Sequence, residues 1–355
     1  MRLKNSACMI SGVVLVSFAS VAAAGFAVPP PPTVNEKANN SQPSNSPGLA
    51  TGLISVTGLS NADKVSGAVG NFALGGGGQA AGLDIKRFGL ASGKPGAAAA
   101  PGDKQWNVWG AFSRSNIAYE FAPLQSSGHV NVFLAGVDYT MGKTIFGVAV
   151  ARDDTDVNLN FSGGRLDGKG WTVSPYLGVA INKNLAFDAT LGFGRTDVDT
   201  ISTIPTVVSG STRSDRTVGS LGLTYREVIG AWTLSARGAF LAVRDKLGAY
   251  TLSNGTFVPD GTVNVSQFRL TGQVAYTTGP VTPYVALSYI NDVRRPDQAP
   301  VGGIAAANDR DAWTPAIGIR FRADNSVYGG IQYSTERGRS EVKNNQLLVN
   351  LGIRF

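Results

Sequence analysis

The chain has 355 residues and a formal net charge of +7, with only 15% charged residues against 43% hydrophobic ones. Its 31 Lys and Arg residues are scattered singly, which argues against nucleic acid as a partner. A single Cys and a single His argue against a disulfide framework and against a zinc site, and no cofactor is expected. The 45 Gly residues follow no triplet period and favour many turns and closely packed strands over helices.

Residues 1–24 have the pattern of a secretory signal peptide. Arg2 and Lys4 precede an apolar run from Met9 to Ala24, which ends in small residues. This run is short for a membrane anchor, the alternative interpretation, since a spanning helix needs roughly 20 apolar residues. We therefore expect cleavage after residue 24. Cys8 would leave with the signal peptide, and the mature chain would carry no thiol, which suits export through an oxidising compartment.

Two segments precede the regular part of the chain. Residues 25–59 are rich in Pro, Asn and Ser and are expected to form a linker or disordered arm. Residues 60–104 are expected to form a short, partly helical segment, in which the apolar residues Ala62, Val65, Val69 and Phe72 fall roughly on one face.

From residue 105 to residue 355 the pattern is uniformly that of β-strands. Apolar and polar residues alternate with period two, as in strands with one apolar and one wet face. Membrane-crossing strands need about 9–11 residues, and many of the predicted segments are longer. The twelve segments are Trp106–Tyr119, His129–Thr140, Thr144–Asn158, Gly170–Asn182, Asn184–Thr200, Asp215–Arg226, Ala231–Arg244, Val263–Thr277, Val281–Arg294, Asp311–Arg322, Ser326–Arg337 and Asn344–Phe355.

The connections between these segments are sorted by parity. The second, fourth, sixth, eighth and tenth are tight turns, whereas the others are longer: 120–128, 159–169, 201–214, 245–262, 295–310 and 338–343. Transmembrane barrels have short periplasmic turns and longer surface loops, whereas a soluble sandwich has no reason to sort its connections. The fold class predicted is therefore all-β: a 12-stranded antiparallel transmembrane β-barrel, with a short, partly helical lumen segment before its first strand.

The faces of the strands agree with a barrel whose apolar side faces lipid. Trp171, Val173 and Leu177 oppose Thr172, Ser174 and Tyr176, and a lone charge such as Asp188, Arg237 or Arg320 is expected to face a wet lumen. Alternation switches near Gln267, which suggests a β-bulge. Aromatic residues near the strand ends are expected to form girdles at the membrane interfaces: Trp106, Tyr139, Tyr225, Trp232 and Trp313.

The last predicted strand has a complete apolar face: Leu347, Val349, Leu351, Ile353 and Phe355. An aromatic last residue after alternating apolar positions resembles the C-terminal strand of bacterial outer-membrane barrels. The resemblance implies that these residues are an assembly signal, recognised by the outer-membrane barrel assembly machinery after delivery by periplasmic chaperones. We also expect this strand to pair with Trp106–Tyr119 and so remove the sheet edge.

A signal peptide, an N-terminal segment and about 250 residues of twelve strands together resemble the autotransporter β-domain. The resemblance implies a C-terminal barrel, a helix that threads its lumen, and a passenger exported to the cell surface. Residues 60–90 are the candidate helix, and small inward residues would leave room for it: Gly178, Ala180, Gly192, Gly194, Ala286 and Gly318. Residues 25–104 are far shorter than typical passengers, so the expected function is to anchor or display this segment in the cell outer membrane, without catalysis.

Three alternatives were weighed. A small outer-membrane pore would leave residues 25–104 in the periplasm. A barrel hydrolase would need His129 as its base with Ser126 or Ser127, but no orienting third group stands at a recognisable spacing. Self-cleavage at Asn39-Asn40, as in some autotransporters, is disfavoured because the dipeptide lies in the linker.

The expected partners are membrane components, and the barrel is expected to be monomeric. Charged residues in the predicted surface loops could contact lipopolysaccharide phosphates or could simply be solvated. They are Arg213, Asp215, Arg216, Arg294, Arg295, Asp297, Asp309 and Arg310.

Overall fold

The computed structural model describes residues 105–160, 162–203, 205–295, 307, 309–323 and 326–355. The predicted signal peptide, linker and partly helical segment, residues 1–24, 25–59 and 60–104, lie outside these ranges. The described ranges lie within the predicted barrel, residues 105–355.

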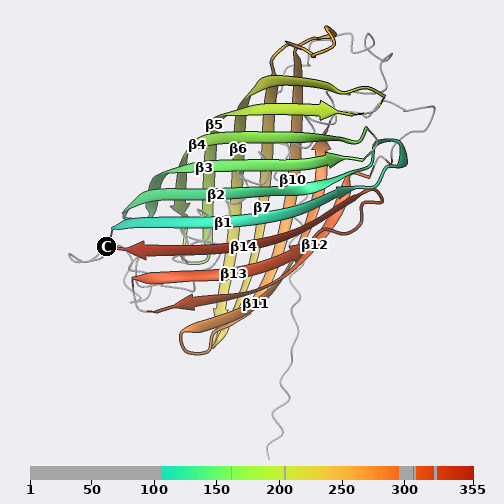
Figure 1. Ribbon diagram of the computed structural model, residues 1–355. Helices are drawn as coiled ribbons and strands as arrows, with labels where there is room; N and C mark the ends of the chain where they lie inside the picture. Colours follow the sequence, from blue (N-terminus) through green and yellow to red (C-terminus); the bar gives the residue numbers. More distant parts are fainter. Residues whose placement is uncertain (1–104, 161, 204, 296–306, 308, 324–325) are drawn as a thin grey trace, which may run out of the picture. The chain divides into compact units, whose positions relative to one another are not determined.

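Twelve strands of the described part close into one antiparallel barrel (Figure 1). Each is paired with the strands before and after it around the ring, and β14 is paired with β1. A separate hairpin, β8 (Tyr250–Thr251) with β9 (Phe257–Val258), stands in the connection between β7 and β10, and a 3-10 turn, η4 (Ala122–Leu124), follows β1. The barrel strands are β1 (Trp106–Tyr119), β2 (Ser126–Met141), β3 (Thr144–Leu159), β4 (Gly164–Ala180), β5 (Leu185–Ser202), β6 (Val208–Ile229), β7 (Trp232–Leu247), β10 (Gly261–Tyr276), β11 (Val281–Arg294), β12 (Asp311–Arg322), β13 (Val327–Thr335) and β14 (Val342–Arg354).

The predicted number and order of strands are confirmed, and the bounds of β1, β11 and β12 agree at both ends. The largest error is in β6, which has 22 residues rather than the predicted span Asp215–Arg226. Its additional residues, from Val208 onward, are mostly Ser, Gly, Thr and Arg and pair with the end of β5. The prediction failed there because both faces of these residues are polar or small, so hydrophobic alternation ends before the backbone pairing does.

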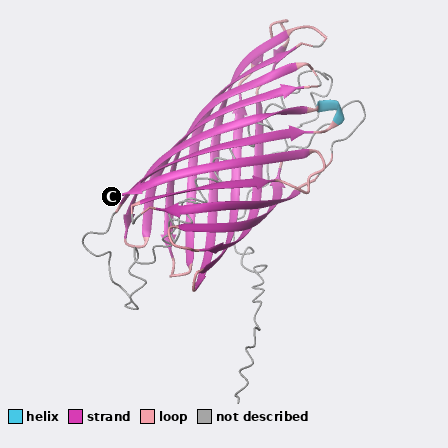
Figure 2. Ribbon diagram, turned by 60° about the horizontal axis from the view of Figure 1, so that its bottom comes forward, coloured by secondary structure: helices cyan, strands magenta, loops and turns pink. Residues whose placement is uncertain are grey.

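The sorting of the connections by length is confirmed with one exception. At one end of the barrel, which we call the short-turn end, the chain reverses at 142–143, 181–184, 230–231, 277–280 and 323–326. Gly142, Gly230 and Gly279 adopt positive φ angles of 58°, 61° and 58° in these turns, a conformation that favours glycine. The opposite end, which we call the loop end, carries the longer connections (Figure 2). The exception is 160–163, since β3 and β4 remain paired up to Leu159 and Gly164.

The predicted faces are also confirmed. Trp171 is 49% exposed on the outer surface of the barrel, whereas its neighbour Thr172, which faces the lumen, is 1% exposed. Asp188 and Arg320 are buried on the inner side as predicted. A β-bulge lies where the pattern suggested one, but the additional residue belongs to β11. Ser266 pairs with Arg294 and Gln267 with Asp292, while β10 remains in unbroken register with β7.

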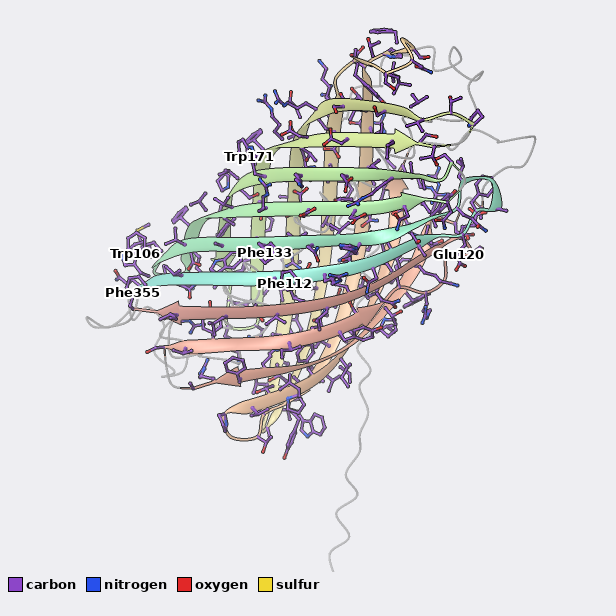
Figure 3. All side chains as sticks on the ribbon, viewed as in Figure 1. Trp106, Phe112, Glu120, Phe133, Trp171 and Phe355 are labelled. Atoms are coloured by element: carbon purple, nitrogen blue, oxygen red, sulfur yellow. The ribbon has the colours of Figure 1, made fainter. Side chains whose placement is uncertain are left out.

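Aromatic residues gather on the outer surface near both ends of the barrel. Ring pairs at the short-turn end are Trp106–Tyr139, 5.0 Å apart between centroids, and Trp232–Tyr276, 4.9 Å apart. Tyr289–Trp313, 5.1 Å apart, lies towards the loop end, whereas Phe112–Phe133, 4.8 Å apart, lies at the middle of its strands (Figure 3). Trp106 and Phe355 mark the short-turn end and Glu120 the loop end in Figure 3. Aromatic residues in these positions are typical of membrane interfaces.

Candidate functional site

The barrel closes where β1 meets β14, a junction that we call the seam. The paired residues run from Asn107 with Arg354 to Tyr119 with Val342. Backbone hydrogen bonds between Trp106 and Phe355, 3.0 Å in both directions, extend the pairing to the residue after β14. Leu347, Val349, Leu351, Ile353 and Phe355 all lie on the outer surface and are 37–60% exposed. The predicted pairing is thus confirmed, whereas the role of these residues as an assembly signal stays a prediction.

A hydrogen-bonded network lines the lumen beside the seam at the short-turn end. Asn107 of β1 donates to Asp138 of β2 (2.8 Å) and accepts from the hydroxyl of Tyr328 of β13 (2.9 Å). The hydroxyl of Tyr176 of β4 donates to the same Asp138 carboxylate (3.0 Å) and accepts from the indole of Trp109 (2.9 Å). Since these side chains come from strands on both sides of the seam, they add a polar connection inside the barrel to the backbone pairing.

Aromatic side chains of this inner surface lie over glycines of the neighbouring strand. A Cβ at Gly352 would overlap the ring of Tyr328, and the same holds for three other directly paired positions. Only glycine leaves room for a ring to lie flat against the backbone of the next strand. The remaining pairs are Trp109 over Gly136, Tyr176 over Gly147 and Tyr284 over Gly318.

This packing changes the interpretation of the small inward residues. Gly178, Ala180, Gly192 and Gly318 face inward and are buried, as predicted. The space beside Gly318 is filled by Tyr284, and that beside Gly192 by Val218 and Ser174. These glycines therefore accommodate side chains of the barrel itself.

A charged triad is buried on the lumen side nearer the loop end. Arg216 of β6 donates from Nε to Asp245 of β7 (2.9 Å), and its Nη1 lies 3.5 Å from Oδ1 of Asp153 of β3. All three side chains are at most 1% exposed. Arg216 was a candidate surface residue from sequence, and this prediction is wrong. Alternation along the extended β6 places Arg213 and Asp215 outside and Arg216 inside.

Other buried charges also have partners. Arg237 of β7 binds Asp188 of β5 through both terminal nitrogens, at 2.5 and 3.0 Å. Near the loop end, Arg339 donates to Asp292 at 2.9 Å and ties the connection between β13 and β14 to β11. Outside the strands, Asp309 accepts from the backbone N–H and hydroxyl of Ser340, which holds the pKa of that carboxyl below its usual value. These contacts fix the connections at the loop end against each other.

Replacement of Arg216 by Met is expected to destabilise the barrel strongly. It would leave Asp153 and Asp245 buried without their cation, a change that typically costs about 3–5 kcal/mol. The free energy of unfolding is to be measured in urea after refolding into detergent micelles. Arg195→Met is the matched control, because its ion pair with Asp215 has side chains 49% and 63% exposed and should contribute at most about 1 kcal/mol. Equal losses in the two variants would contradict the burial of the triad.

The middle of the lumen is apolar on two sides that face each other. On β2, Val130, Val132 and Leu134 point inward and are 3%, 1% and 4% exposed. Across the ring, Leu241 and Val243 of β7 are 0% and 3% exposed, in a cluster with Val218, Ala239 and Val265. This surface was not predicted from the sequence, because apolar residues were assigned to the lipid side. The sequence of β2 could have indicated it, because both the odd- and the even-numbered residues in its middle are apolar, as in a strand that is buried on both faces.

The residues considered for a hydrolase form no hydrogen-bonded group in the described part of the chain. Ser126 points inward and is 3% exposed, whereas Ser127 and His129 lie on the outward face of β2 without a hydrogen bond between them. Among the described residues there is no group of acidic, His and Cys side chains that could hold a metal ion. No helix in the same ranges is long and apolar enough to cross a membrane.

Comparison with known proteins finds the same architecture. The translocator domain of the autotransporter NalP from Neisseria meningitidis is similar with a TM-score of 0.62 and 12% identity, over 76% of this chain and 94% of that one. The beta domain of the Bordetella autotransporter BrkA gives 0.61 and 15%, over 71% and 100%. The transport unit of AIDA-I from Escherichia coli gives 0.50 and 13%, over 76% and 96%. A search of curated protein sequences finds no match.

These structural similarities, at such low identities, show the fold. The family assignment comes from the sequence, since the model of the autotransporter beta-domain matches residues 107–334. This match covers well over half of the chain and nearly all of the barrel. The chain therefore belongs to the autotransporter beta-domain family, whose barrels lie in the outer membrane.

Proposed function

We propose that this barrel anchors the segment before it, residues 25–104, and displays part of that segment at the cell surface after cleavage of the signal peptide. In this proposal the barrel inserts into the outer membrane and holds residues 25–104, and no catalytic step is assigned to it. The observation that carries the proposal is the apolar surface in the middle of the lumen.

A water-filled pore requires a polar inner surface. Here Val132, Val218 and Leu241 point inward and are at most 1% exposed. Apolar side chains on facing strands favour a lumen filled by an apolar or amphipathic segment. Residues 60–72 supply such a segment, because Ala62, Val65, Val69 and Phe72 fall roughly on one helical face.

The direction of the chain supports the same function. β1 begins at Trp106, at the short-turn end, which is periplasmic in transmembrane barrels. A segment that precedes Trp106 and reaches the outside must therefore pass through the lumen. Crossing about 30 Å takes about 20 residues as a helix or about 10 as a strand. Residues 60–104 suffice for this passage, and residues 25–59 would remain outside.

Labelling of intact cells tests the display. Ser44→Cys is introduced in a Cys8→Ser background and treated with a membrane-impermeant maleimide. If residues 25–59 are outside, Ser44→Cys is labelled without permeabilisation.

Two exposed positions serve as references. Asp260→Cys, at the loop end, should be labelled from outside, whereas Lys183→Cys, in a short turn, should require permeabilisation. If Ser44→Cys, like Lys183→Cys, were labelled only after permeabilisation, residues 25–59 would lie in the periplasm and display would be contradicted. Reversed behaviour of the two references would contradict the orientation of the barrel itself.

We further propose that the outward face of β14 is the signal recognised by the barrel assembly machinery. Phe355 is 60% exposed, and Leu351 and Ile353 beside it are 50% and 48% exposed on the same surface. These outward side chains contribute little to the packing inside the barrel. They are therefore available to bind another protein before the barrel closes.

Phe355→Ser is expected to lower the amount of folded barrel in the outer membrane severalfold while leaving refolding of the purified protein into detergent nearly unchanged, as for most surface substitutions. The folded fraction in cells and in vitro is to be measured by heat-modifiable mobility. Phe193→Ser, at a surface residue of β5 that is 53% exposed, is the control for loss of an outward aromatic. Equal effects of the two substitutions in cells would contradict a special role of Phe355.

A further inference from the structure

The outer surface of the barrel changes from apolar to charged at a definite level near the loop end. The last apolar residues before this level include Val150 of β3, Trp171 of β4 and Phe193 of β5, each 49–53% exposed. The next outward residue on each of these strands is a cation. On the loop-end side of the apolar surface, the first charged outward residues of β1 and β3–β7 are Arg114, Arg152, Lys169, Arg195, Asp215 and Arg244, while β2 has no Asp, Glu, Lys or Arg on its outward face.

Three of these cations have no anion directly opposite them on a neighbouring strand. Arg114 lies between Asn131 and Leu347 on the neighbouring strands, and Arg244 lies between Thr217 and Asn264. Arg152 lies between Phe133 and Trp171. All three are exposed, and none forms an ion pair with any residue that the structure describes.

Two arginines farther towards the loop end are paired with carboxylates. Arg165 contacts Asp156 and Asp167 at 2.9 and 2.8 Å, and Arg213 contacts Asp197 at 2.9 Å. At the boundary itself, Arg195 is paired with Asp215 at 2.9 Å, and Lys169 lies laterally between Asp154 and Asp197. Arg165, Arg195 and Arg213 are therefore paired with carboxylates, whereas Arg114, Arg152 and Arg244, at the edge of the apolar surface, are not.

We propose that Arg114, Arg152 and Arg244 bind phosphate groups of a phosphorylated glycolipid in the outer leaflet. Arginine presents a planar array of donors that matches a phosphate, and its aliphatic part can lie along apolar surface while the guanidinium reaches the headgroups. Trp171 beside Arg152 is of the residue type that favours the same depth. The loop end faces the outside of the cell in transmembrane barrels of this kind. The ligand is therefore the phosphorylated glycolipid of the outer leaflet.

The charges predicted to lie in surface loops were also candidates for contact with lipopolysaccharide phosphates, but they are other residues than these three arginines. Arg216 is buried in the lumen, Arg213 is paired with Asp197, and Asp309 is bonded to Ser340. The arginines now proposed are set apart by their position at the edge of the apolar surface and by having no carboxylate directly opposite on the adjacent strands. The inference requires the barrel to lie in the outer membrane with its loop end outside, and it does not require display of residues 25–59.

Retention of lipid by the folded full-length chain tests the proposal. Refolded protein in neutral detergent is incubated with labelled lipopolysaccharide, re-purified, and assayed for bound lipid. The test variant is Arg114→Gln/Arg152→Gln/Arg244→Gln. The control, Arg165→Gln/Arg195→Gln/Arg213→Gln, removes the same charge from paired arginines. Loss of several charge-assisted hydrogen bonds should weaken retention by at least about tenfold in the test variant and by less than about twofold in the control.

Two further arms identify the ligand. In the first arm, the unaltered chain is given enzymatically dephosphorylated lipopolysaccharide. It should retain this lipid as poorly as the test variant retains intact lipopolysaccharide. Phosphatidylglycerol should be retained less well than lipopolysaccharide, and equal retention would overturn the assignment to a glycolipid. Equal losses in the test and control variants would overturn the assignment to these three arginines. Heat-modifiable mobility of every variant shows that the barrel is folded, so that failure of folding is not mistaken for failure of binding.

Discussion

The pairing of β1 with β14 is the constraint on which the rest of the structure depends. In hydrocarbon each unpaired backbone N–H or C=O costs several kcal/mol, so a sheet that crosses a membrane must have no edge. Thirteen residue pairs join the first strand to the last and remove both edges at once. Closure also separates an inner from an outer surface, and the two-residue period of every strand then decides which side chains face lipid and which face the lumen.

The inner surface is organised in levels along the barrel. Near the short-turn end, Asn107, Asp138 and Tyr328 connect strands on both sides of the seam. The middle is apolar on facing strands, and nearer the loop end Arg216 holds Asp153 and Asp245 in a dry site. Charges buried in this way require partners, because an isolated charge in such a site would be strongly destabilising. The inner surface therefore resembles a protein interior more than the wall of a channel, in agreement with a lumen that holds a segment of chain.

Much of this architecture could be predicted from the sequence, because period two and turn length are local properties. The bounds of β1, β11 and β12 and the seam pairing of β14 followed from them. Where both faces of a strand have the same character, the period vanishes. Polar residues on both faces hid the first third of β6, and Arg216, the second residue of the predicted strand, was therefore grouped with the charges of the preceding loop. Apolar residues on both faces of β2 hid Val130 and Val132 as lumen residues. Which arginines lack a carboxylate depends on lateral register, and a single strand's sequence does not contain this information.

Cross-linking across the seam tests the central claim of closure most directly. Ser115 and Gln346 are direct partners whose side chains are hydrogen-bonded at 2.9 Å, so Ser115→Cys/Gln346→Cys in a Cys8→Ser background should form a disulfide under mild oxidation. Ser115→Cys/Asn344→Cys, displaced by two residues along β14, should not, because diagonal neighbours are about 7–8 Å apart. Loss of free thiols in the first variant alone, measured by maleimide mass shift on the folded protein, is the predicted result. Free thiols in both variants, or cross-linking of the displaced pair, would contradict the closed barrel in this register.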